Sequence, residues 1–386
     1  MSYIYEGTMT DIERFLILNM IEDLGSIRTQ ALIERFGSPE EIFKARQKDL
    51  EQVEGIGPKI APKIWHGIRE IDVSNEMKLI REHKIKIMTI LDKDYPLNLK
   101  NIYDPPVVLY VKGGIIPEDD LAIAIVGSRR ASFYGMKTAE RLGFELAARG
   151  ITVVSGLARG IDSSSHKGAL KAKGRTLAIL GSGLINIYPE EHRSLAEEIS
   201  ENGAVISEFP MLTIPDKGNF PKRNRVVNGL SKGVVVVEAA QRSGALITAD
   251  CALQEGREVF AVPGKIDSST SKGTNKLIKQ GAKLAETAED ILEELNLFHR
   301  VGGPEVHLRG GTGQTGIYNN KEYLSPRLDK CESLVYNLLT SEPQHIDELS
   351  VVLKLRVSEV SGILLNLEMK KLARQLPGKN FVKDTD

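Results

Sequence analysis

Short apolar runs alternate with helix-like segments through the middle of the chain. Nearly every position of each run is apolar, and the runs span residues 121–126, 151–154, 176–180, 204–207, 233–237 and 258–262. Such runs are typical of strands that are buried on both faces of a sheet. The segment 136–150 is one of the helical stretches between them, and it closes on Gly150. The alternation predicts an α/β fold with a doubly wound, mainly parallel sheet and right-handed crossovers.

The amino-terminal part has a different pattern, of short helices that are split by glycine turns. Residues 24–38 and 53–64 are two versions of one motif, in which a glycine turn leads into a helix. The motif resembles tandem helix–hairpin–helix units. In the second unit the free N–H groups of the helix could face a phosphate, with Lys59 and Lys63 nearby. A helical module that docks proteins and does not contact nucleic acid is an equally good interpretation.

The pattern changes again on either side of the predicted sheet. Residues 85–115 are rich in β-forming residues and prolines, which predicts extra strands that lead into the sheet. Glycine and polar residues without periodicity begin at about residue 298 and predict a flexible linker. Three helical segments and a hairpin then suggest a winged helix. The predicted division is a helical module at 1–78, a Rossmann-like domain at 79–297, a linker at 298–327 and a winged-helix domain at 328–386.

Composition narrows the functional classes only slightly. The net charge is −1, so an anion-binding surface has to come from local clustering of basic residues. The two cysteines, Cys251 and Cys331, lie too far apart along the chain for a thiolate zinc motif and are too few for a disulfide framework. The chain has no apolar run of about 18 residues. We therefore expect a cytoplasmic protein that does not insert into membranes.

The loops that follow the predicted strands share one composition of glycine, serine and arginine. Ligands of doubly wound sheets bind at the carboxyl ends of the strands, where such loops lie. Glycine permits close backbone approach, serine donates a hydrogen bond and arginine neutralises an anion. The loops contain Gly127, Ser128 and Arg129 after the first strand, Ser155, Gly156 and Arg159 after the second, Gly181, Ser182 and Gly183 after the third, and Arg242, Ser243 and Gly244 after the fifth.

Basic residues are concentrated in the segment before the fifth strand. Every charged residue between Asp216 and Glu238 is basic, namely Lys217, Lys222, Arg223, Arg225 and Lys232. We expect Arg223 and Arg225 to face solvent and to form, with Lys222 and Asn224, part of a groove for a polyphosphate backbone. One alternative is that the basic residues lie on separate solvated faces. Another is that the two arginines pair with buried carboxylates such as Glu238.

Catalytic motifs are weak. Asp162 and the serines after it are better explained as a helix N-cap and first turn than as parts of a hydrolytic site with His166. Glu238 ends a buried strand and could act as a general base, but we expect it to orient a neighbouring arginine instead. No dinucleotide fingerprint or Walker-type lysine is present, and no carboxylate spacing suggests magnesium binding. We therefore expect a protein that is not an enzyme and that needs neither a cofactor nor a metal.

The segments "VGSRRASFYG", "VVSGLARGIDSSSHKGAL" and "FPKRNRVVNGLSKGVVVVEAAQRSGALITA" resemble the DNA-processing protein A family, also called Smf. The resemblance covers roughly residues 80–295. It implies an extended Rossmann-like fold that forms a homodimer, binds single-stranded DNA and helps load RecA recombinase onto DNA entering by natural transformation. It also implies that Arg129 and the cluster 222–225 line the DNA groove, beside the loop at Ser155 and Gly156. Phe220 is a candidate for stacking on a base, although a core role is equally compatible with its position.

A runner-up function is enzymatic. The sheet also resembles the lysine-decarboxylase-like nucleotide phosphoribohydrolases, which release a base from a nucleoside monophosphate. Those enzymes carry a Pro-Gly-Gly-x-Gly-Thr-x-x-Glu motif where this chain has "VEAAQRSGALITA". The second glycine-rich stretch and the downstream glutamate are missing, which favours binding without catalysis. A scaffold whose terminal modules bind only proteins is a third possibility.

Overall fold

The computed structural model describes residues 9–297, 330–340, 342–353, 355–370 and 372–384, except for the side chains of residues 330 and 331. The chain forms two compact units, residues 1–303 and residues 304–386. The linker predicted at 298–327 lies outside the described residues.

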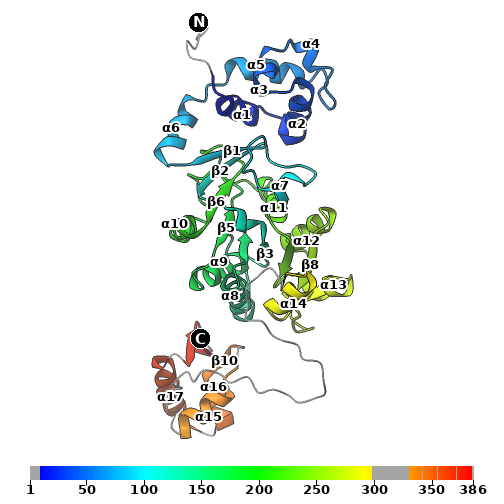
Figure 1. Cartoon of the computed structure of the whole chain (residues 1–386). Coiled ribbons are helices and arrows are strands. Elements are labelled where there is room, and N and C mark those ends of the chain that lie inside the picture. The colour runs from blue at the N-terminus through cyan, green and yellow to red at the C-terminus, as the bar shows by residue number, and fades with distance from the viewer. Residues whose placement is uncertain (1–8, 298–329, 341, 354, 371, 385–386) are drawn as a thin grey trace. The chain divides into compact units, whose positions relative to one another are not determined.

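The first unit is built on a nine-stranded sheet with the strand order β1-β2-β6-β5-β4-β3-β7-β8-β9 (Figure 1). Its strands are β1 (Lys86–Thr89), β2 (Val108–Gly113), β3 (Ala122–Val126), β4 (Thr152–Ser155), β5 (Thr176–Ile179), β6 (Ala204–Ser207), β7 (Gly233–Val236), β8 (Glu258–Ala261) and β9 (Lys283–Leu284). The strands from β6 to β9 in this order are parallel to one another. Strand β2 is antiparallel to β6, and β1 is antiparallel to β2. The predicted mainly parallel α/β sheet and its extra leading strands are confirmed.

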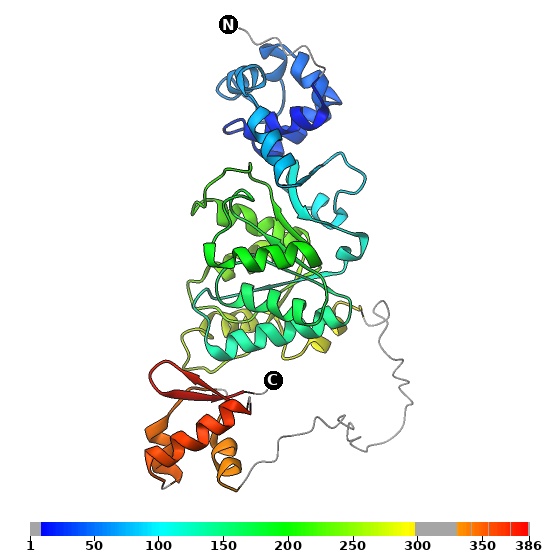
Figure 2. The same cartoon turned by 90° about the vertical axis from the view of Figure 1, so that its left-hand side faces the viewer.

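Helices cover both faces of this sheet (Figures 1 and 2). They are α7 (Leu97–Lys100), α8 (Phe133–Ala148), α9 (Ile161–Lys171), α10 (Arg193–Asn202), α11 (Asn219–Gly229), α12 (Gly244–Gln254), α13 (Lys272–Lys279) and α14 (Ala288–Glu294), with the 3-10 turns η1 (Pro117–Asp120) and η2 (Glu190–His192). One core cluster joins α8 and α14 to Ile123 and Ile125 of β3, and the other joins α11 and α12 to Ala124 and Val126. Successive side chains of a strand point to opposite faces, so an all-apolar strand fits this double burial.

The amino-terminal helices pack on the edge of the sheet that carries β1 and β2 (Figure 1). They are α1 (Asp11–Met20), α2 (Gly25–Phe36), α3 (Pro39–Lys44), α4 (Gln47–Leu50), α5 (Ala61–Glu70) and α6 (Ser74–Glu82). Gly25 and Gly55, in the two predicted turns, have φ angles of 65° and 75°, which glycine adopts without strain. Arg28 links the turns by donating to the carbonyl oxygens of Asp23 and Gly55, each at 2.7 Å. Lys63 forms an ion pair with Asp23, so its ammonium group is already partnered in the free protein.

Arg225 joins the amino-terminal helices to the sheet. Its Nε lies 3.2 Å from Oδ2 of Asp104, and its Nη2 contacts the Glu208 carboxylate and lies 3.4 Å from Oγ of Ser26 on α2. The Arg225 side chain is only 13% exposed. The expectation that Arg225 faces solvent is therefore wrong, because three segments close around its guanidinium. Burial raises the pKa of Glu208, and the charge of Arg225 opposes that rise.

The second unit has the winged-helix arrangement that the sequence predicts. It contains α15 (Lys330–Leu338), β10 (Gln344–His345), α16 (Ile346–Leu353), α17 (Val357–Met369), β11 (Ala373–Leu376) and β12 (Asn380–Lys383). The strands form a small antiparallel sheet in the order β10-β12-β11, and one apolar cluster packs the three helices against it.

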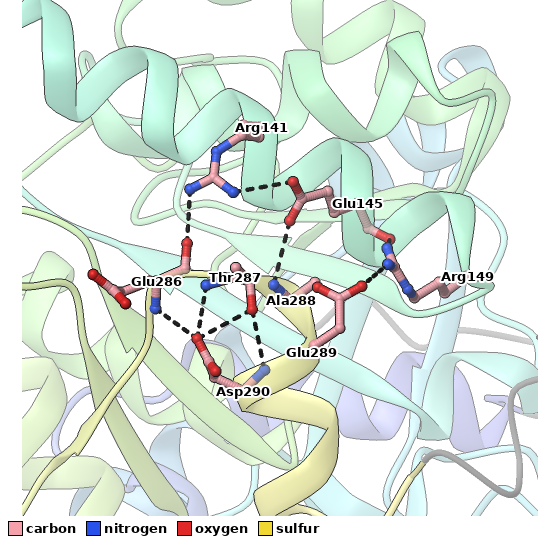
Figure 3. Close-up of polar contacts among 8 residues, drawn as sticks. All are labelled: Arg141, Glu145, Arg149, Glu286, Thr287, Ala288, Glu289 and Asp290. Carbon is pink, nitrogen blue, oxygen red and sulfur yellow. Dashed lines mark hydrogen bonds and ion pairs between the residues drawn. The ribbon is translucent and has the colours of Figure 1, made fainter. Parts of the chain in front are cut away.

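Hydrogen bonds from α8 hold the start of α14 in place (Figure 3). Arg141 donates to the Glu286 carbonyl oxygen at 2.7 Å, and Glu145 accepts from the Ala288 backbone at 3.3 Å. Asp290 accepts from the backbone N–H groups of Glu286 and Thr287 at 2.8 and 2.9 Å. These bonds satisfy N–H groups at the start of α14 that have no partner within the helix.

No helix within the described ranges has both the length and the apolar character needed to cross a bilayer.

Replacing Arg225 with alanine should lower the free energy of unfolding of the first unit by about 3 kcal/mol, because it leaves the largely buried Glu208 carboxylate without its cation. Urea denaturation of the whole chain measures the change. The exposed Lys222 lies on the same helix, and Lys222→Ala should change stability by less than about 0.5 kcal/mol. Equal effects of the two substitutions would contradict a structural role for Arg225.

Replacing Thr287 with alanine should cost about 1 kcal/mol, because Thr287 is the N-cap of α14 and its Oγ1 accepts from the Asp290 backbone. The same denaturation experiment measures this loss. Ser194→Ala on the exposed face of α10 is the matched control and should stay within about 0.5 kcal/mol of the parent. A Thr287 variant as stable as the control would show that the Thr287 cap adds nothing to stability.

Candidate nucleic-acid interface

A groove of about 800 Å³ lies at the carboxyl ends of β3, β4 and β7. The strand order reverses here, since β4 to β6 lie on one side of β3 and β7 to β9 on the other. The loops after β3 and β7 touch, because the Ser128 backbone N–H donates to the Glu238 carbonyl oxygen at 2.8 Å. Among the described residues, the predicted site residues that line the groove are Gly127, Ser128, Arg129, Gly156, Arg223, Asn224, Ser243 and Gly244.

Helix α11 presents one face to the groove. Phe220, Arg223, Asn224 and Val227 all line it, with the spacing of three and four residues that puts side chains on one side of a helix. Lys222 is exposed and, like Arg225, is not among the lining residues. Adjacent members of a charged run diverge by about 100° around a helix. The basic cluster 222–225 is therefore divided between two sides of α11.

Arg223 is buried beneath the loop that follows β4. The residue is only 5% exposed, and its Nη1 donates to the Ile179 carbonyl oxygen at 2.6 Å. A Cβ atom on Gly156 would lie 1.9 Å from this Nη1, so the guanidinium fits only because residue 156 has no side chain. The expectation that Arg223 faces solvent is wrong. Its charge acts on the groove from below the Gly156 backbone.

Burial and charge oppose each other at Arg223. Loss of hydration lowers the pKa of Arg223 to about 10, while the nearby Asp162 favours the charged form. Arg223 therefore keeps its positive charge at neutral pH. Burial likewise raises the pKa of Asp162, and the charge of Arg223 works against that rise. Asp162 lies in the first turn of α9, as predicted, and accepts from the Ala158 backbone at 3.3 Å.

His166 is held by buried contacts that do not place it for catalysis in the groove. Its Nδ1 lies 2.6 Å from the Thr176 hydroxyl, which itself donates to the Val153 carbonyl oxygen, so the histidine must be the donor. Burial lowers the pKa of His166 to about 3, which leaves the ring neutral at physiological pH. His166 is fully buried and does not line the groove. The sequence interpretation of this segment as a helix start rather than a triad agrees with these contacts.

Aromatic side chains and arginines form a recess of about 190 Å³ beside the groove. The Arg129 guanidinium lies over the Phe220 ring at 4.7 Å from its centroid. The Tyr188 ring is tilted by 45° against Phe220, with a centroid separation of 5.9 Å. Arg159, a predicted site residue, lines this recess together with Arg130. Arg129 and Arg130 thus place charge next to two partly accessible aromatic rings.

Glu238 has partners other than the arginine that the sequence suggested. Its carboxylate accepts from the backbone and hydroxyl of Ser132, at 2.8 and 2.6 Å, and from the Thr270 hydroxyl at 3.3 Å. The expectation that Glu238 orients an arginine is therefore wrong. Because Ser132 is also the N-cap of α8, Glu238 fixes the loop that carries Arg129.

The remaining predicted residues have varied positions. Ser155 is fully buried and donates to the Ile125 carbonyl oxygen at 2.6 Å, so it supports the loop from within. Ser243 caps α12, with its hydroxyl accepting from the Ala245 backbone at 3.2 Å. Arg242 is not among the groove-lining residues of the described part of the chain. None of these positions tests DNA contact directly, so the predicted site remains a prediction.

Several lining residues were not among those predicted as site residues. They include Arg130, Lys217, Tyr188, Ser269 and Thr270, while Phe220, the sequence candidate for stacking on a base, lines both the groove and the recess. Arg130 and Lys217 belong to basic runs that the sequence makes visible, and Phe220 precedes the cluster on α11. Tyr188 and Thr270 lie in segments that share the family resemblance, but no site role was predicted for them, and only the folded chain brings them to the groove or its recess.

Two family models match the chain. One is described as DNA recombination-mediator protein A and matches residues 86–296, and the other, the DprA winged helix domain, matches residues 321–379. Protein Smf of Synechocystis is 33% identical over 390 residues, which cover 95% of this chain and 97% of the relative. DNA processing protein DprA of Bacillus subtilis is 47% identical over 216 residues, covering 56% and 73% of the two chains.

A solved structure agrees with the sequence matches. The X-ray structure of DNA processing protein A from Streptococcus pneumoniae aligns with a TM-score of 0.66 and 35% identity, over 74% of this chain and 98% of that one. The first family model covers more than half of the chain, and the Synechocystis relative aligns over nearly its full length. The chain therefore belongs to the DNA recombination-mediator protein A family, whose members include DNA processing protein A and Smf.

Proposed function

We propose that this protein binds single-stranded DNA in the groove at the carboxyl ends of β3, β4 and β7. The observation that carries the proposal is the charge of the groove. Within the described part of the chain, its charged lining residues are the four cations Arg129, Arg130, Lys217 and Arg223 and the single buried carboxylate Asp162. The whole chain has a net charge of −1, so this excess of cations is local. A local cationic groove attracts a phosphate backbone without a basic surface elsewhere.

The aromatic recess favours a single strand over a duplex. Phe220 and Tyr188 lie beside the arginines, and a base can stack on such rings only when it is free of its pairing partner. Stacking on aromatic rings tolerates every base, and phosphate contacts carry no sequence information. The proposed binding is therefore largely independent of sequence.

The start of α12 adds a second place for a phosphate. Gly244 and Ala245 line the groove at the amino-terminal end of this helix, where the helix dipole favours an anion. The Ala245 N–H is already bonded to the Ser243 hydroxyl, so the dipole rather than this N–H supplies the attraction. Lys217 and Asn224 line the same groove. A strand that runs from Arg129 to this helix end would contact both anion-binding regions.

We propose further that the bound strand is passed to RecA recombinase, and that the protein acts as a homodimer. The description of the matching family as recombination mediators supports a role between DNA and a recombinase. Natural transformation is one process that presents single-stranded DNA to such a mediator. The proposal places the protein in the cytoplasm, where the recombinase acts.

The enzymatic alternative has little support in the groove. A phosphoribohydrolase needs an accessible carboxylate beside the phosphate loop, whereas Glu238 is buried and is held by Ser132 and Thr270. The purified protein should therefore release no free base from nucleoside monophosphates. Chromatography of the reaction mixture checks this, and accumulation of free base in proportion to protein concentration would favour the enzyme.

Replacing Arg129 with alanine should weaken binding to oligonucleotides of every sequence. Each phosphate neutralised on a single strand contributes about −0.7 to the slope of log affinity against log salt concentration, so the variant's slope should be flatter by about 0.7. Fluorescence anisotropy with a labelled oligothymidine at several salt concentrations measures both effects.

Lys171→Ala is the matched control, since it also removes one cation but lies at the last residue of α9, away from the groove. It should leave the salt slope unchanged. Tight binding of the parent protein together with the same slope in both variants would place the DNA outside this groove.

A further inference from the structure

Arg159 is held by a carboxylate at the rim of the aromatic recess. Its Nη2 lies 2.9 Å from Oε2 of Glu191, and its Nε contacts Oε1 of the same carboxylate. The pair is therefore bidentate, with the two parallel hydrogen bonds that a guanidinium also makes to a phosphate. These contacts lower the pKa of Glu191, so the carboxylate is charged at neutral pH.

The backbone brings this pair to the recess from two loops. Arg159 follows β4, whereas Glu191 lies in the turn η2, directly after the recess residues Tyr188 and Pro189. His192 ties the two loops together, because its Nδ1 lies 2.9 Å from the Leu157 carbonyl oxygen. This contact holds the two loops together independently of the ion pair.

We propose that Glu191 is an internal substitute for a DNA phosphate, which occupies Arg159 until a bound strand displaces it. The proposal rests on the proposed single-strand binding in the groove. Carboxylate and phosphate both accept a bidentate pair of hydrogen bonds from arginine, so one replaces the other without a change in the position of the guanidinium.

The ion pair is exposed enough to exchange. The side chains of Arg159 and Glu191 are 55% and 52% exposed, and ion pairs at such positions are weak. Once displaced, the Glu191 carboxylate is left near the strand and repels it. Glu191 therefore lowers the affinity of the groove, and this keeps the strand exchangeable.

The test compares four proteins by anisotropy with a labelled oligothymidine of about 20 nucleotides at low salt. Glu191→Gln should bind about two- to fivefold more tightly than the parent, because Arg159 no longer has to leave a charged partner. Arg159→Ala should bind more weakly, with a salt slope flatter by about 0.7. In the double variant the gain from Glu191→Gln should be lost.

Asp49→Asn is the matched control for the loss of one negative charge. Asp49 forms a bidentate pair with Arg46, with N–O distances of 2.8 and 3.0 Å, on the amino-terminal helices and away from the groove. Its affinity should stay near that of the parent.

Each other outcome overturns the inference. Equal gains in Glu191→Gln and Asp49→Asn would show a general charge effect, and a gain that persists without Arg159 would show that the two residues act separately. Weaker binding by Glu191→Gln would make Glu191 a positioning residue instead. A parent protein that does not bind the oligonucleotide would refute the proposed function itself, and the inference with it.

Discussion

The groove depends on a guanidinium that is buried under a backbone without a side chain. Arg223 extends from α11 below Gly156, bonds to the end of β5 at Ile179, and lies near the Asp162 carboxylate of α9. Burying a charge is costly unless hydrogen bonds and an opposite charge compensate for it. Here the compensation comes from two elements, β5 through the Ile179 carbonyl oxygen and α9 through Asp162, while Gly156 after β4 leaves the room. The charge can therefore remain buried only while the ends of β4 and β5 and the helices α9 and α11 keep their places.

This arrangement separates the charges that hold the fold together from those that face the groove and the recess. Arg223 and Arg225 are two residues apart, on different sides of α11. Arg225 closes the junction with the amino-terminal helices through Asp104 and Glu208, whereas Arg223 supports the floor of the groove. Arg129 and Arg159 remain accessible above that floor, Arg129 over an aromatic ring and Arg159 in a half-exposed ion pair. The helical repeat thus divides a basic run between a structural junction and the groove.

The sequence predicted the sheet well because its signals are local. The apolar strands, the alternation with helices and the glycine-rich loops each occupy one short window, and their order determines a doubly wound fold. The predictions failed where a partner comes from a distant segment. Nothing near Arg225 in the sequence indicates that Asp104 will reach it, and nothing near Glu238 indicates Ser132. Tyr188 joins the recess for the same reason, through a loop whose course is determined by tertiary packing.

Photochemical crosslinking measures the position of the bound strand most directly. A single-stranded oligonucleotide that carries iododeoxyuridine would be crosslinked to the full chain, and the modified peptides would be identified by mass spectrometry. The account predicts crosslinks in the peptides that contain Tyr188 or Phe220, which competing duplex of the same sequence suppresses only weakly. Crosslinks confined to α1–α6 or to α15–α17, or equal competition by duplex, would contradict it.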